Sequence, residues 1–355
     1  MQIRKQLAWF ALFTTILLTT YAVELMFYKA ASSIEVRDKF IWPFSSVSPW
    51  NMPIGSGAIY IPANIQQAGF AKADEGYIYQ VNSNDPVRSL YGVGAWGPGR
   101  CTGNYPEGTM QIPRGLVIPD ATPTNTPNNS SAFLMPDGQT LVQVNALTRC
   151  NAGGNVYGWR SDDVSIYGEG IPGGHGGSGL SSIGGTIRVG ELTGTEPIHH
   201  ALKIDLQASK YLYYSGSNPG YRWPALHADS YAASVYGGTN PSLVMGTLLA
   251  IPPSVTAASL NLQTPAAWKL FQALQNYGGY VVDDTAGDYH AFCVEQGVLA
   301  QFRNTFGYDF ADSSGLFYND FMKLFQALQI VDNNGPDSVG GGGEPLVSLA
   351  PPIGN

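Results

Sequence analysis

The sequence predicts a mostly β protein, built as a sandwich of two antiparallel sheets with one or two helices at its periphery. Glycine and proline account for 43 and 24 of the 355 residues, and they interrupt the chain too often for a helical bundle. Short runs of alternating apolar and polar residues recur between these breaks, as in strands with one buried face. The chain also has 20 tyrosines, 15 phenylalanines and 7 tryptophans, and these residue types favour strands.

The N-terminal segment predicts export. Arg4 and Lys5 precede an uncharged apolar stretch at 7–23, which Glu24 ends. A short positive region followed by an apolar run is typical of a signal peptide, but the run is also close to the length of a membrane-spanning helix. We therefore expect residues 1–31 to be a signal peptide or an N-terminal membrane anchor. The rest of the chain is expected to be secreted or extracytoplasmic, with membrane contact only through this segment if it is uncleaved.

Cysteine usage agrees with export. Cys101 and Cys150 both lie in polar, turn-rich surroundings, and we expect a disulfide between them. Cys293 lies in an alternating apolar run at 289–294. That position favours a buried structural thiol over a catalytic nucleophile.

The β-sandwich domain is expected to span residues 45–300. A loop rich in proline and threonine at 120–127 must lie on its surface. The strand candidates, in chain order, are 76–81, 140–144, 185–192, 198–206 and 210–214. In the fourth of these, alternation predicts one face with His200, Leu202, Ile204 and Leu206 and another with His199, Ala201, Lys203 and Asp205.

One helix has clear end signals. Thr264 is a favourable N-cap, Pro265 fits the first turn, and Gly278 and Gly279 end the helix. A strand at 280–283 is expected to follow directly.

The C-terminal part is expected to differ from the sandwich. A second helix at 319–330 repeats a heptapeptide of the first and lies in a small helical addition, residues 301–335. The glycine- and proline-rich segment 336–355 is expected to be a flexible tail.

Charge scarcity singles out candidate catalytic residues. Charged residues make up 12% of the chain, against roughly 25% in soluble domains. A charge within an apolar strand must be paired or lie in a cleft, because burying it alone is costly. On this basis, and with the one histidine of the glycine-rich run at 168–179, the candidates are Asp163, His175, Arg188, Glu191, His200 and Asp229. Candidate substrate-binding residues, chosen mainly because aromatic faces stack on sugar rings, are Trp159, Tyr213, Tyr221, Arg222 and Trp223.

Two reactions fit these residue types. In the first, His200 or a tyrosine removes a proton beside a uronate carboxylate, which Arg188 or Arg222 neutralises, and the polysaccharide is cleaved by elimination. In the second, two carboxylates among Asp163, Glu191 and Asp229 serve as acid and base in glycoside hydrolysis. The sequence does not choose between them.

Structural explanations compete with both reactions. The two adjacent histidines, His199 and His200, are equally typical of a structural pair, and Glu191 with Arg188 of an ion pair. The segment 283–288 shares some features of a calcium loop but lacks its closing acidic residue. We expect a turn there and no cofactor or metal, with a structural calcium ion as the alternative.

The net charge of −8 argues against a nucleic-acid partner, because binding a phosphate backbone requires clustered cations. An extracellular polysaccharide is the expected partner.

The motif series also resembles a known group. The segments 158–163, 190–192, 200–204 and 274–283 are similar to those of a large set of secreted bacterial proteins, largely uncharacterised, and the resemblance covers about residues 45–295. It implies a jelly-roll or concanavalin-like β-sandwich and brings no established reaction. The residues at its recurring polar positions are Asp163, Glu191, His200 and Asp229.

These observations predict an extracellular carbohydrate-active protein that cleaves a polysaccharide by acid–base chemistry, as a lyase or a glycoside hydrolase. The alternative is a non-catalytic glycan-binding or cell-surface structural module that uses the same aromatic residues.

Overall fold

The computed structural model describes residues 36–93, 100–119, 121 and 129–354. The expected leader at 1–31 and most of the loop at 120–127 lie outside the described residues. The strands are β1 (Tyr60–Pro62), β2 (Phe70–Gln80), β3 (Val87–Gly92), β4 (Tyr105–Gln111), β5 (Ser131–Leu134), β6 (Thr140–Thr148), β7 (Val156–Arg160), β8 (Val164–Ser165), β9 (Leu202–Leu206), β10 (Leu248–Ala250), β11 (Gly279–Asp284), β12 (Tyr289–Glu295) and β13 (Gln329–Val331). The helices are α2 (Ala208–Tyr211), α3 (Ala232–Val235), α4 (Pro265–Asn276), α5 (Val298–Phe306) and α6 (Gly315–Ala327), with short 3₁₀ turns at η1 (Arg100–Thr102) and η2 (Val339–Gly341).

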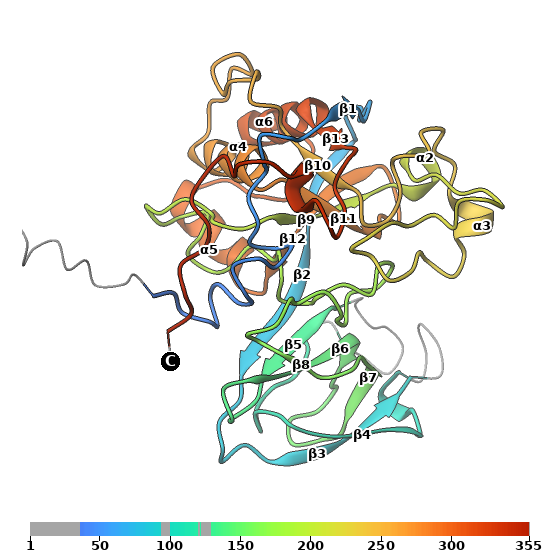
Figure 1. Ribbon diagram of the computed structural model, residues 1–355. Coiled ribbons are helices and arrows are strands. Elements are labelled where there is room, and N and C mark those ends of the chain that lie inside the picture. Colours follow the sequence, from blue (N-terminus) through green and yellow to red (C-terminus); the bar gives the residue numbers. More distant parts are fainter. Residues whose placement is uncertain (1–35, 94–99, 120, 122–128, 355) are drawn as a thin grey trace, which may run out of the picture.

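The strands form two lobes that share one long strand (Figure 1). The strand order is β1-β13-β10-β11-β9-β12-β2-β5-β6-β7-β3-β4, and β8 pairs with β6 off this path. β2 pairs with β12 from Phe70 to Gly76 and with β5 from Tyr77 to Gln80. In this order, the strands that stand before β2 form the upper lobe, and those that stand after β2, together with β8, form the lower lobe. β2 itself passes through both lobes.

The β-rich class is confirmed, but the sheet is mixed. The pairs β9–β11, β2–β12, β2–β5 and β3–β7 are parallel. This corrects the expectation that the strands are purely antiparallel. Apolar alternation reports which face of a strand is buried and carries no information on strand direction. A parallel pair also needs a long crossover, and between β9 and β11 the chain makes one that includes α4.

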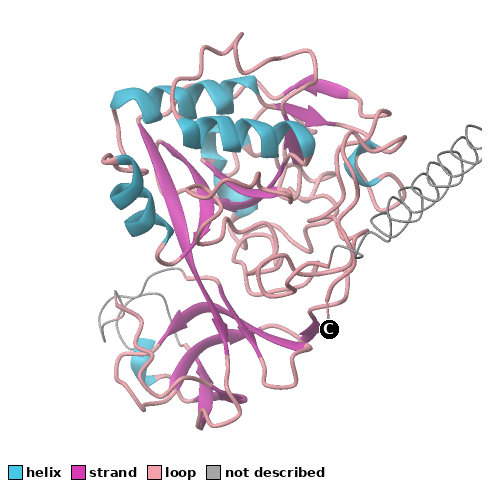
Figure 2. Cartoon of the chain, turned by 90° about the vertical axis from the view of Figure 1, so that its left-hand side faces the viewer, coloured by secondary structure: helices cyan, strands magenta, loops and turns pink. Residues whose placement is uncertain are grey.

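Helices cover one face of the upper sheet (Figure 2). The apolar sides of α4, α5 and α6 pack on Leu202, Ile204 and Leu206 of β9 and on Phe292 of β12 in one continuous core. The predicted alternation is confirmed from Leu202 to Leu206, because Lys203 and Asp205 lie on the opposite face, as does Ala201 just before the strand. The strand begins at Leu202 rather than at 198, so His199 and His200 lie outside it.

The opposite face is covered by loops rather than by a second sheet. Residues of the segment 40–54, among them Phe44 and Trp50, pack with Leu180 and Ile183 of the glycine-rich segment against Val282 and Cys293. A Cβ at Gly184 would lie 2.5 Å from Nε1 of Trp50. The glycines therefore let the loop pack closely against Trp50 and the sheet, because a side chain at these positions would keep the loop farther away.

Several local predictions are confirmed. α4 begins after Thr264, β11 follows it, and Cys101 and Cys150 form a disulfide. Asp320 of α6 accepts hydrogen bonds from Gln263 N, Thr264 N and Thr264 Oγ1 at 2.7, 2.8 and 2.9 Å. The cap of α4 is therefore supplied by the neighbouring helix rather than by the threonine side chain.

Other local predictions are wrong. Residues 185–192 form turns instead of a strand, and their apolar side chains Ile187 and Leu192 are buried from these turns in the helix-side core. The strand expected at 210–214 is absent, since residues 210 and 211 end the short helix α2 and residues 212–214 have no regular structure, and α5 was not predicted.

The C-terminal segment is packed rather than flexible. Gly340 N donates to Asn334 Oδ1, and Gly55 N donates to Gly340 O. Gly340 and Gly341 are buried, and a Cβ on Gly340 would lie 2.3 Å from Pro53 O. Across the described stretches, no helix is long and apolar enough to cross a bilayer.

Candidate functional site

Four neighbouring strands and the glycine-rich loop bring ionisable side chains together on the loop-covered face of the upper sheet. The strands are β11, β9, β12 and β2. We call this set the buried polar cluster; its members are Asp74, His175, Lys203, Asp205, Asp283 and Cys293. The register places Asp283 opposite Asp205 and Cys293 opposite Asp74. Residues two apart on a strand share a face, so Lys203 and Asp205 both contribute.

An irregularity in β11 brings Asp283 into the cluster. The pairing of β11 with β9 shifts between Val281 and Asp283. In a regular ladder Val282 would lie opposite Asp205. The extra residue re-aims the strand, as β-bulges commonly do beside functional sites.

His175 is at the centre of the cluster and is 2% exposed. Its Nε2 lies 3.3 Å from Cys293 Sγ and 3.6 Å from Asp74 Oδ2, and its Nδ1 lies 3.2 Å from Gly176 O and 3.7 Å from Asp283 Oδ2. Burial, together with the charge of Lys203, lowers the pKa of His175 well below its usual range. The ring is therefore neutral, and the Gly176 carbonyl fixes the proton on Nδ1.

The cluster also contains one lysine, Lys203, and three aspartates, Asp74, Asp205 and Asp283. Lys203 Nζ donates to the carbonyls of Ser181 and Ser182 at 3.1 and 3.0 Å, and burial lowers its pKa. Burial raises the pKa of Asp74 to about 6. Burial and the neighbouring aspartates raise the pKa of Asp205 well above its usual range.

Cys293 is also buried beside an acidic side chain of the cluster. Its Sγ lies 3.7 Å from Asp205 Oδ1. Burial and the charge of Asp205 raise the pKa of the thiol. The thiol is therefore protonated, as expected for a buried thiol.

A cavity of about 690 Å³ adjoins the cluster. Asp283 belongs to both. The other lining residues are Asn145, Gly176, Gly177, His227, Ala228, Asp229, Ser230, Tyr231, Asp284 and Ala286. The carboxyl groups of Asp229, Asp283 and Asp284 thus face one hollow beside the glycine-rich loop, which we call the acidic cavity.

Two of these carboxyl groups are joined by tyrosines. Tyr236 donates its hydroxyl to Asp229 Oδ2 at 2.7 Å, and Tyr231 donates to Asp284 Oδ2 at 3.3 Å and also faces Asp229. Asp284 Oδ1 accepts from Ala208 N at 2.7 Å. Burial raises the pKa of both carboxyl groups, and the charge of Asp229 raises the pKa of Asp284 further. One proton and one negative charge are therefore favoured on this pair.

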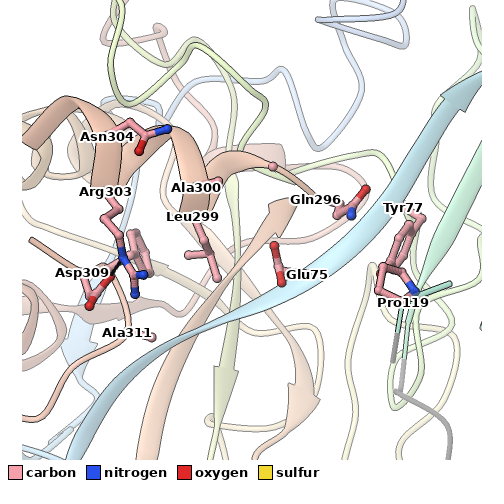
Figure 3. A pocket seen from close by; sticks show the side chains of 12 residues that line it. Glu75, Tyr77, Pro119, Gln296, Leu299, Ala300, Arg303, Asn304, Asp309 and Ala311 are labelled. Carbon is pink, nitrogen blue, oxygen red and sulfur yellow. Dashed lines mark hydrogen bonds and ion pairs between the residues drawn. The ribbon is translucent and has the colours of Figure 1, made fainter. Parts of the chain in front are cut away.

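A second cavity, of about 570 Å³, lies on the helix side of the sheet (Figure 3). Arg303 and Asp309 at its rim pair with each other. Glu75 points into it from β2, on the face opposite to Asp74. The walls of this cavity therefore combine one ion pair and one carboxylate with other polar and apolar side chains.

The predicted residues Arg188, Glu191 and His200 do come together, but as an internal network. His200 Nε2 lies 3.1 Å from Glu191 Oε1, and Arg188 N donates to Glu191 Oε2 at 2.6 Å. The Arg188 guanidinium pairs with Glu295 at 3.0 Å. Burial lowers the pKa of His200, but the charge and hydrogen bond of Glu191 outweigh it, so the pKa is raised. Arg188, Glu191 and His200 line neither of the two cavities described above.

The remaining predicted residues are dispersed. Asp163 pairs with Arg160 at 2.7 Å in the lower lobe, where the Trp159 ring lies under Arg100. Arg222 donates to the carbonyls of Asp332 and Asn334.

Three of the aromatic candidates stay on the upper lobe but away from the acidic cavity. Trp223 lines a third cavity of about 390 Å³. Tyr221 is 36% exposed, and the backbone of Tyr213 bonds to Leu243 O. Of the predicted site residues, only His175 and Asp229 belong to the cluster or the adjoining cavity.

Sequence reasoning missed most of this site. The missed residues are Asp74, Lys203, Asp205, Tyr231, Tyr236, Asp283, Asp284 and Cys293. A signal was present in β9, where Lys203 and Asp205 are charged residues within an apolar run. Comparison of the chain with protein-family models, with curated proteins and with solved structures finds no match.

Proposed function

We propose that this protein hydrolyses the glycosidic bonds of an extracellular polysaccharide, with Asp229 and Asp284 as its acid–base pair. The observation that carries the proposal is the tyrosine-bridged pair of carboxyl groups in the wall of a cavity of about 690 Å³. Glycoside hydrolysis needs two carboxyl groups in different protonation states on either side of the scissile bond.

The surroundings assign the two roles. Asp229 faces the hydroxyl groups of Tyr236 and Tyr231, and hydrogen bonds to a carboxylate favour its charged form. Asp229 is therefore the base or nucleophile. Burial and the charge of Asp229 raise the pKa of Asp284, so we assign Asp284 as the acid that donates a proton to the leaving oxygen.

The cavity walls favour hydrolysis over elimination. The described residues lining this cavity include no lysine or arginine, whereas elimination beside a uronate requires its carboxylate to be neutralised. Arg188 and Arg222, the expected neutralising groups, are occupied by Glu295 and by backbone carbonyls. An acidic wall fits a neutral or amino sugar, and the exposed ring of Tyr231, 42% accessible, offers a stacking face.

The test is incubation with a panel of neutral, amino-sugar and uronate polysaccharides, with reducing ends and ultraviolet absorbance of unsaturated products read in parallel. We expect reducing ends without new absorbance. Asp229→Asn and Asp284→Asn should each lower the rate by about 10²–10⁴-fold. The control is Asp163→Asn, a carboxylate of the lower lobe, which should keep the wild-type rate.

Three results would contradict the proposal. Unsaturated products would indicate elimination. Binding of a glycan without any product would favour the non-catalytic module. Full activity of both cavity variants would show that the acid and base lie elsewhere.

A further inference from the structure

Three ligand atoms of the buried polar cluster have the arrangement of a metal site. Cys293 Sγ, His175 Nε2 and one Asp74 carboxylate oxygen all lie within 4.8 Å of one another. We propose that these atoms bind a divalent transition-metal ion of the zinc class, a property that goes beyond the proposed hydrolysis.

Two of the distances between the ligand atoms fall in the range of tetrahedral coordination. With bonds of about 2.0–2.1 Å to nitrogen or oxygen and about 2.3 Å to sulfur, the ligand atoms of a tetrahedral zinc site lie roughly 3.3–3.8 Å apart. Here Nε2 lies 3.3 Å from Sγ and 3.6 Å from Asp74 Oδ2. An ion between them needs only small adjustments of side chains.

The histidine is held as a metal ligand requires. Its Nδ1 faces the Gly176 carbonyl at 3.2 Å and the Asp283 carboxylate at 3.7 Å. A zinc-bound histidine commonly donates its other ring proton to such a group, which fixes the ring and its tautomer. The lone pair of Nε2 is thereby directed toward Cys293 and Asp74.

The charges of the cluster also favour a cation. One ammonium, that of Lys203, faces the carboxyl groups of Asp74, Asp205 and Asp283. Buried negative charge is unfavourable without compensation, and a dication supplies it. When the ion binds, the S–H bond of Cys293 breaks, a metal–sulfur bond forms and the proton leaves to water.

The donor set selects the kind of metal. Thiolate and imidazole ligands favour zinc-class ions over calcium or magnesium, which prefer oxygen. Asp205 lies 3.7 Å from Sγ and outside the three-ligand set, so we assign the fourth position to water. The side chain of Asp74, 32% exposed, provides the route of entry.

The ion would tie the glycine-rich loop to the sheet. Its ligands come from β2, β12 and the loop, and Gly176 and Gly177, next to His175, line the acidic cavity. The site therefore anchors one wall of that cavity.

The test uses the full chain after treatment with a chelator, titrated with Co²⁺ and then with Zn²⁺. We expect one equivalent of Co²⁺ with a thiolate-to-cobalt charge-transfer band, displaced by Zn²⁺. Cys293→Ser should abolish the band and weaken Zn²⁺ binding by more than about 100-fold. The matched control is His227→Asn, which removes an exposed histidine of the neighbouring cavity and should leave binding unchanged.

The wild-type spectrum decides the outcome even if Cys293→Ser fails to fold. Absence of binding to wild-type protein would overturn the proposal. Binding without a charge-transfer band, weakened by Asp284→Asn, would overturn it as well, because the ion would then occupy the acidic cavity.

Discussion

The junction between α4 and α6 offers a stability prediction with a magnitude that follows from the contacts. Asp320 is 1% exposed and accepts three hydrogen bonds from Gln263 and Thr264. It also pairs with Lys323 at 3.2 Å. Asp320→Ala removes the acceptor and leaves two backbone N–H groups at the start of α4 without it.

The expected loss follows from these contacts. A hydrogen bond to a charged group contributes about 1.5–3 kcal/mol, and an unsatisfied buried donor costs about 1–3 kcal/mol. Because these terms overlap, we expect Asp320→Ala to lower the free energy of unfolding by about 3–5 kcal/mol. Asp320→Asn keeps an oxygen acceptor and loses mainly the pair with the partly exposed Lys323, so its cost should be about 1–2 kcal/mol.

The assay is urea unfolding followed by tryptophan fluorescence, since Trp268 lies on α4, with hydrogen exchange of residues 263–268 as a local readout. The control is Asp309→Ala, which removes an exposed ion pair and should change stability by less than about 1 kcal/mol. If Asp320→Ala proves no less stable than this control, the assignment of the helix cap to Asp320 is wrong.

Three further outcomes are expected. Glu191 raises the pKa of His200, so the stabilisation from this pair should be complete below the pKa of an unfolded histidine, about 6.5, and lost as pH rises through the folded pKa. The Tm difference between wild type and Glu191→Gln should therefore shrink at alkaline pH. A Tm difference that stays constant with pH would refute this expectation. Gly184→Ala should cost about 1–3 kcal/mol by overpacking Trp50, whereas Gly115→Ala, with open space around it, should not; equal Tm values for the two variants would count against the close packing. Replacing Cys101 and Cys150, which are 49 residues apart, by serine should lower the free energy of unfolding by about 4 kcal/mol. Hydrogen exchange should rise first in the lower lobe, and a uniform rise across both lobes would contradict this expectation.

Local features of the fold were predictable because their signals lie within a few residues. The cap and proline before α4, the alternation of β9 and the paired cysteines all act over short stretches of sequence. The parallel pairs were not predictable, since the same alternation fits either strand direction. The strand expected at 185–192 failed because Ile187 and Leu192 are buried in the helix-side core from a turn, and such burial produces the same apolar pattern as burial in a strand.

The site was harder to predict than the fold. Charge scarcity singled out Glu191, His200 and Arg188, and the structure brings them together, but Glu191 pairs with His200 and Arg188 with Glu295 in the interior. Asp74, His175 and Cys293 come from three distant segments, and only tertiary structure brings them together. The register shift that turns Asp283 toward His175 leaves no recognisable mark in the sequence.

The strand shared by the lobes has a consequence for biosynthesis. As the chain emerges from the ribosome, residues 70–80 meet β5 at 131–134 long before β12 at 289–295 is made. The lower lobe can therefore be completed while residues 70–76 of β2 still lack their partner strand β12. Unpaired strand edges of this kind can pair with other chains and lead to aggregation. For the same reason, neither lobe can be produced as a separate fragment without its own copy of β2.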